Sequence, residues 1–113
     1  MNQQTDQPTV NGHKTLDDCR RQIDALDADL LRLLNQRAAI ACEIASIKVT
    51  SGLPAYDGNR ERHVLARVVE KNAGPLDQQS VTDIFSGIIR ETRRLGTQRM
   101  EEQNGTVKSA QRV

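Results

Sequence analysis

Residues 16–48, LDDCRRQIDALDADLLRLLNQRAAIACEIASIK, carry the strongest structural signal of this chain. Apolar residues recur in it at alternating steps of three and four, which is typical of a long helix with a heptad seam. Thr15 is the expected N-cap of this helix, and Ser51-Gly52 is its expected end. The pattern therefore predicts one very long N-terminal helix. The residues of its seam are Leu16, Cys19, Ile23, Leu26, Leu30, Leu33, Ile40, Ile44 and Ile47.

Two shorter helices are expected to follow, without any strand. One opens at Asp57 as N-cap and runs to about Asn72. The other opens at Asp77 and ends at Gly96, because a glycine commonly follows the last helical residue. The sequence thus predicts an all-α fold with three helices per chain. The residues expected in the core of the two shorter helices are Val64, Leu65, Val68, Val69, Val81, Ile84, Phe85, Ile88 and Ile89.

The two ends of the chain are polar and lack apolar periodicity. Residues 1–14 and 97–113 are interpreted as flexible tails around a single domain at 15–96. The start has no apolar signal segment and no run reaches transmembrane length, so a cytoplasmic protein is expected. With 16 Lys and Arg against 15 Asp and Glu, the composition indicates neither a nucleic-acid partner nor a membrane partner.

The length of the first helix predicts an assembly. A helix over residues 16–51 is about 54 Å long, whereas a compact globule of this size has a diameter of only about 35 Å. Two short helices cannot cover the whole apolar seam. The sequence therefore predicts an intertwined helical homodimer in which the seam is shared between two chains.

Three cations on this helix are candidates for binding a small anion. Arg37 interrupts the seam, and Lys48 lies 11 residues later, within about 20° of the same helix face. Arg20 lies 17 residues before Arg37, about 25 Å along the helix and about 100° around it, too far to serve the same small site. In an antiparallel dimer it could complete the site of the other chain. For Arg37 alone, a buried structural ion pair is an equally good interpretation. Arg20 and Lys48, taken singly, are typical of solvated charges.

A second group of polar residues is expected on the inner faces of the shorter helices. Asp57, Arg60 and Glu61 share one helix face with the apolar stripe, and Thr92 lies on the stripe of the third helix. Taken singly, Arg60 is typical of a solvated charge, Glu61 of a surface ion pair, and Thr92 of a hydroxyl bonded to a helix carbonyl. No spacing of residues suggests a metal site, a phosphate loop or a catalytic triad.

Four sequence elements together resemble the all-helical class, type II, of chorismate mutase. They are R-x-x-I-D-x-L-D at 20–27, L-L-x-x-R at 33–37, I-x-x-x-K at 44–48 and D-x-x-R-E at 57–61. The resemblance covers about residues 16–96. It implies an isomerase that converts chorismate, a small dicarboxylate, to prephenate by an intramolecular [3,3] rearrangement in phenylalanine and tyrosine biosynthesis. It also implies a homodimer with shared active sites and no cofactor.

The same resemblance assigns roles to individual residues. The positions of Arg37 and of Arg20 from the partner chain bind the substrate carboxylates, and the position of Lys48 donates a hydrogen bond to the ether oxygen. The position of Glu61 receives the ring hydroxyl. The other substrate-binding positions are Asp57, Arg60 and Thr92, the last of which is usually a serine.

One position departs from the family pattern. Gly96 stands where the family usually carries Gln or Glu, a second group at the ether oxygen. Either the helix ends early and Gln98 folds back, or Lys48 works without this partner. Two other functions also fit the long helix: an isochorismate-pyruvate lyase of the same architecture, and a non-enzymatic helical dimerisation module. The D-x-x-R-E element favours the mutase over the lyase.

Overall fold

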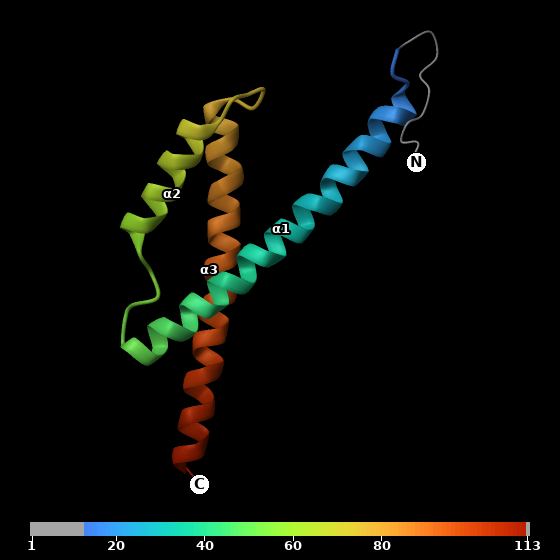
Figure 1. The fold of residues 1–113 in the computed structure, drawn as a ribbon. Coiled ribbons are helices and arrows are strands. Elements are labelled where there is room, and N and C mark those ends of the chain that lie inside the picture. The colour runs from blue at the N-terminus through green and yellow to red at the C-terminus, as the bar shows by residue number, and fades with distance from the viewer. Residues whose placement is uncertain (1–12, 113) are drawn as a thin grey trace. The chain divides into compact units, whose positions relative to one another are not determined.

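The computed structural model describes residues 13–112, with side chains described up to residue 103. Three helices make up this part of the chain: α1 at Leu16–Ser51, α2 at Gly58–Lys71 and α3 at Gln78–Arg112 (Figure 1). No strand occurs among the described residues. The predicted all-α fold with a very long first helix is confirmed. None of these helices is long and apolar enough to cross a lipid bilayer.

Both ends of α1 are formed by the residues that the sequence predicts. The hydroxyl of Thr15 accepts a hydrogen bond from the Asp18 main-chain N–H at 3.0 Å, and the Asp18 carboxylate accepts one from the Thr15 N–H at 3.0 Å. The bond from the Thr15 N–H lowers the pKa of Asp18. At the other end Gly52 has a φ of 68°, and the Leu53 N–H donates to the Lys48 carbonyl at 2.9 Å. This arrangement is a Schellman motif, which needs a left-handed residue at the position of Gly52.

The chain divides into two compact units within α1, one up to Asn35 and one from Gln36 onward. In the first unit, the described residues from Leu16 on form only the first half of α1. Of these, Asp18 is the only buried residue. The apolar seam of this half is exposed to solvent, with about half or more of the surface of Ile23, Leu26 and Leu30 accessible.

The second unit contains the rest of α1 together with α2 and α3. Helix α2 packs beside the first part of α3 (Figure 1). The apolar core consists of Ala45, Val81 and Ile89. Gly96 brings α3 close to α1, since a Cβ atom at this position would lie 3.5 Å from the Ala45 Cβ. Small residues on both helices therefore allow the close approach.

Burial in the second unit is weaker than the sequence predicts. Val81 and Ile89 are buried, but the apolar residues of α2 are only half-buried. Ile84 is 48% exposed, so the expectation that it lies in the core is wrong for the single chain. Periodicity identifies the apolar face of a helix, but α2 and α1 cover only part of that face on α3.

The caps of the other two helices are confirmed. Asp57 accepts a hydrogen bond from the Arg60 N–H at 3.0 Å at the start of α2, which ends before Asn72. Asp77 accepts one from the Ser80 N–H at 2.7 Å, and this bond lowers the pKa of Asp77. Each carboxylate satisfies an N–H group that has no partner within the first turn of its helix.

Helix α3 does not end at Gly96 as the sequence predicts but continues to Arg112. A single glycine costs a helix only about 1 kcal/mol relative to alanine, and contacts with α1 offset this cost. Past Gly96, the amide of Gln103 donates a hydrogen bond to the Ser46 hydroxyl of α1 at 3.1 Å. The predicted tail at 97–113 therefore begins as helix, and its flexibility stays a prediction. The tail predicted at 1–14 lies, up to residue 12, outside the described residues.

Candidate active site

A pocket of about 260 Å³ lies in the second unit, between the second half of α1, the loop before α2, the start of α2 and the middle of α3. Six of the seven predicted site residues line it: Arg37, Lys48, Asp57, Arg60, Glu61 and Thr92. The seventh, Arg20, belongs to the first unit and is exposed. Its role in the site of a partner chain stays a prediction.

Arg37 is half-buried and is held by a hydroxyl, not by a carboxylate. Its Nη1 donates a hydrogen bond to Thr92 Oγ1 at 3.2 Å, and this hydroxyl donates in turn to the carbonyl of Ile88 at 2.9 Å. No carboxylate forms an ion pair with Arg37 among the described residues. The part of the chain that the structure describes therefore shows no structural ion pair for this arginine. A guanidinium has five N–H groups, so most of them remain available to an anionic ligand.

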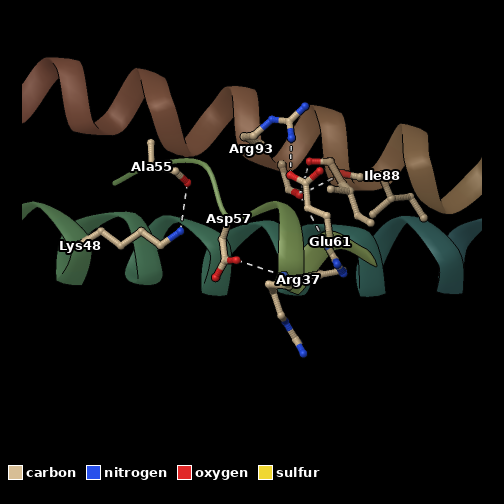
Figure 2. A network of polar contacts seen from close by, with 10 residues as sticks. Arg37, Lys48, Ala55, Asp57, Glu61, Ile88 and Arg93 are labelled. Atoms are coloured by element: carbon tan, nitrogen blue, oxygen red, sulfur yellow. Dashed lines mark hydrogen bonds and ion pairs between the residues drawn. The ribbon is translucent and has the colours of Figure 1, made fainter. Parts of the chain in front are cut away.

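Lys48 lies in the last turn of α1 and joins this helix to the loop that follows. Its Nζ donates a hydrogen bond to the carbonyl of Ala55 at 3.0 Å (Figure 2). Its own carbonyl accepts the bond from the Leu53 N–H at the helix end. The ammonium group carries three donors, of which the loop uses one. Lys48 can therefore hold the loop and still donate to a ligand in the pocket.

The first turn of α2 contributes two carboxylates and one cation. Asp57 and Arg60 are exposed, whereas Glu61 is half-buried. The residues at 57, 60, 61 and 64 all line the pocket, as expected from their common helix face. Asp57 uses one oxygen for its cap, and Glu61 pairs with Arg93 of α3 (Figure 2).

Arg93 is a pocket residue that the sequence analysis missed. Its guanidinium carbon also lies 5.3 Å from the centroid of the Tyr56 ring, a cation–π geometry. Arg93 follows Ile89 by four positions and precedes Gly96 by three, so helical periodicity places it on the face that lines the pocket. That signal was present in the sequence. Thr97 and Met100 also line the pocket and were missed because the helix was expected to end before them.

The structure settles part of the question raised by Gly96. The helix continues through this residue, Gln98 is exposed, and Gln98 does not line the pocket. The expectation that Gln98 folds back after an early helix end is therefore wrong. Gly96 itself lines the pocket and adds no polar side chain to it.

The charges of the pocket favour an anion. Its lining includes four cations, Arg37, Lys48, Arg60 and Arg93, and only two carboxylates, Asp57 and Glu61. Among the described residues, no three His, Cys, Asp or Glu side chains gather as they would around a metal ion. The arrangement can bind a small molecule with two negative charges, orient it and donate hydrogen bonds to an oxygen that gains charge.

Comparisons with known proteins agree on one family. The family described as chorismate mutase type II matches residues 19–97. A chorismate mutase of Thermus thermophilus (form II) is similar in structure, with a TM-score of 0.72 and 29% identity over 73% of this chain and 93% of that one. The chorismate mutase of Helicobacter pylori in complex with prephenate has a TM-score of 0.71 and 31% identity, and the match covers 77% of this chain and 94% of that one.

Longer proteins contain a similar segment. The bifunctional chorismate mutase/prephenate dehydratase of Neisseria gonorrhoeae is 42% identical over 72 residues, which are 64% of this chain but 19% of that protein. The corresponding protein of Aquifex aeolicus is 35% identical over 78 residues, 66% of this chain and 22% of its own length. The chain thus spans about a fifth of the length of these curated relatives.

Proposed function

Since the chain belongs to the chorismate mutase type II family, we propose that it catalyses the intramolecular [3,3] rearrangement of chorismate to prephenate. The observation that carries the proposal is the pocket that combines Arg37, Lys48 and Glu61 from two helices. The reaction would place the protein in the biosynthesis of phenylalanine and tyrosine, in the cytoplasm. Neither a nucleic acid nor a membrane is needed for it.

The rearrangement makes demands that this kind of pocket meets. One bond breaks and another forms within the same molecule, so the reaction needs no nucleophile, metal ion or general base. The protein must hold the enolpyruvyl arm over the ring, which is a task of orientation. It must also stabilise the negative charge that builds up on the ether oxygen as its bond to the ring breaks. An excess of cations around the pocket supports both tasks.

The contacts of each side chain support its proposed role. Arg37 has free N–H groups for a carboxylate, and its Thr92 contact fixes the guanidinium. Lys48 has free donors for the ether oxygen. Glu61 uses its Oε2 atom for Arg93, and among the described residues no donor binds its Oε1 atom, which can therefore accept the ring hydroxyl. The remaining substrate-binding residues are Asp57 and Arg60.

We also propose the intertwined homodimer, in which Arg20 of each chain completes the pocket of its partner. The exposed seam supports it: Leu26, Leu30 and Ile40 each keep more than half of their surface accessible in the single chain. Burying each large apolar side chain of such a seam contributes about 1.5–3 kcal/mol. A second copy of the same seam is the simplest cover, because an antiparallel pairing is self-complementary.

The test is an assay of the purified chain with chorismate and, separately, with isochorismate. We expect prephenate from chorismate and no release of pyruvate from isochorismate. Pyruvate release without prephenate would instead establish the lyase of the same fold. Absence of both products from a folded dimer would favour the non-enzymatic dimerisation module. Arg32→Ala is a suitable control, since Arg32 lies on α1 outside the pocket and its ion-pair partner among the described residues is Asp29.

A further inference from the structure

Arg93 connects three segments that border the pocket. It extends from α3 and forms an ion pair with Glu61 in the first turn of α2 (Figure 2). Its guanidinium also lies over the ring of Tyr56 in the preceding loop. Its side chain is 37% exposed and that of Glu61 is 25% exposed. These contacts are the link between α3 and the part of the pocket that Glu61 contributes.

The ion pair with Arg93 uses one of the two carboxylate oxygens of Glu61. Nη1 of Arg93 donates to Oε2 of Glu61, and the described residues offer no donor to Oε1. A glutamate side chain has three rotatable bonds, and one fixed oxygen greatly restricts the positions of the other. Arg93 therefore orients the free oxygen of Glu61 without occupying it.

The stability of the fold does not explain the ion pair. Partly exposed ion pairs contribute little to folding, because water already solvates both charges well. Arg90 and Arg94 of the same helix show the ordinary case: both pair with the neighbouring Glu91, and neither lines the pocket. Arg93 differs from them because its partner, Glu61, lies 32 residues away in the chain and lines the pocket.

We propose that Arg93 is a positioning residue, which acts through Glu61 on the hydroxyl of the bound substrate. It holds Oε1 of Glu61 in place for that hydroxyl and, through Tyr56, keeps the loop before α2 against the pocket. This inference rests on the proposed function, because it takes the substrate to be an anion that also carries a hydroxyl group. Arg93 itself does not touch the reacting atoms.

A double-mutant cycle tests this assignment. We compare kcat and KM with chorismate for the wild type, Arg93→Met, Glu61→Gln and the double variant. Arg93→Met should lower kcat/KM by about tenfold, the value of one charge-assisted hydrogen bond. In the Glu61→Gln background the same change should have an effect of less than about twofold, because a group that acts only through Glu61 cannot act once that carboxylate is gone. Arg93→Lys should recover part of the activity, since it restores a cation beside Glu61.

The outcomes separate the possible roles. Effects that multiply in the double variant would show that Arg93 acts independently of Glu61, and wild-type kinetics of Arg93→Met would show that it does not act at all; either result overturns the assignment. Arg94→Met is the matched control and should behave as the wild type. If circular dichroism shows that Arg93→Met is unfolded, Arg93→Gln takes its place in the cycle, with the same criteria. A folded wild type that does not convert chorismate would refute the proposed function, and the assignment of Arg93 with it.

Discussion

At the scale of single residues, Arg37 explains more about this chain than any other position. It replaces an apolar residue in a heptad seam, where a charge without a partner costs several kcal/mol. Two features reduce this cost in the structure. The Thr92 hydroxyl accepts a hydrogen bond from the Arg37 guanidinium, and Arg37 stays only half-buried at the pocket wall. Since no described carboxylate pairs with it, most of its N–H groups remain available to an anionic ligand.

Substitution of Arg37 separates binding from folding. Arg37→Ala should lower kcat/KM by about a hundredfold or more, as is typical for the loss of a preorganised donor. Helical content should remain, because no carboxylate of the described residues loses an ion-pair partner. Arg37→Leu should be equally inactive and should melt at a higher temperature than the wild type, since seam positions prefer apolar residues. Activity assays and thermal melts check this, and unfolding of both variants would restore a structural role for Arg37.

At the scale of secondary structure, the helices are defined by local signals at their ends. Asp18, Asp57 and Asp77 accept hydrogen bonds from main-chain N–H groups at the starts of their helices, and Gly52 ends α1 in the left-handed conformation. Gly96 is different, because it lies within α3 in the helical conformation and contacts Ala45. A side chain is therefore tolerated at Gly96 but disfavoured at Gly52.

Alanine substitution at these two glycines should change stability in opposite directions. At Gly96 the added Cβ would make an ordinary contact at 3.5 Å with the Ala45 Cβ, so Gly96→Ala should stabilise the fold by up to about 1 kcal/mol. At Gly52 the φ of 68° penalises a Cβ, so Gly52→Ala should destabilise it by a similar amount. Urea unfolding of both variants measures the difference. A loss of stability in Gly96→Ala would mean that the α1–α3 contact tolerates no added atom.

The helix caps predict how stability depends on acid. Hydrogen bonds from main-chain N–H groups lower the pKa of Asp18 and of Asp77 in the folded chain. A carboxyl whose folded pKa lies below its unfolded value of about 3.9 stabilises the fold above that pH, and the contribution is lost as the pH falls through the folded pKa. The melting temperature should therefore fall between about pH 5 and pH 2. Asp77→Asn, which keeps the cap without the titrating group, should weaken this dependence, whereas Asp27→Asn on the exposed face of α1 serves as the control.

At the scale of the whole molecule, the single chain leaves two features incomplete. The seam of α1 is exposed over most of its length, and Arg20 is not among the residues that line the pocket. The proposed homodimer accounts for both, because a second chain covers the seam and brings its own Arg20. Light scattering at micromolar concentration should find a dimer. A stable and active monomer would refute the shared site.

Mixing two inactive variants tests whether the site is shared. Arg20→Ala and Arg37→Ala homodimers should each be nearly inactive. Unfolding and refolding them together gives about half heterodimers if the chains pair at random, and each heterodimer has one site with both lesions and one with none. Activity should recover toward about a quarter of the wild type. If Arg20 served its own chain, every site would lack an arginine, so no recovery, with heterodimers confirmed by mass spectrometry, would refute the proposal.

Local sequence patterns predicted the starts of the three helices, the end of α1 and six of the residues that line the pocket. The caps at Thr15, Asp57 and Asp77 depend on hydrogen bonds between residues three positions apart, and apolar periodicity depends on the geometry of one helix. Both can therefore be predicted from a short window of sequence. The common face of Arg37 and Lys48 follows from the same geometry, and both residues line the pocket. These predictions succeeded because the physical interactions behind them are short in sequence.

The length of α3 and the ion-pair partner of Glu61 depend on tertiary contacts. Helix α3 continues past Gly96 because the close approach to Ala45 and the bond from Gln103 to Ser46 hold it against α1, and neither interaction can be seen in a local window of sequence. The partner of Glu61 was likewise undetermined, since any nearby cation could pair with it on the sequence alone. The packing of α2 against α3 brings Arg93, 32 residues away in the chain, into contact with Glu61. Contacts between segments distant in sequence depend on how helices pack, which the pattern within each helix does not specify.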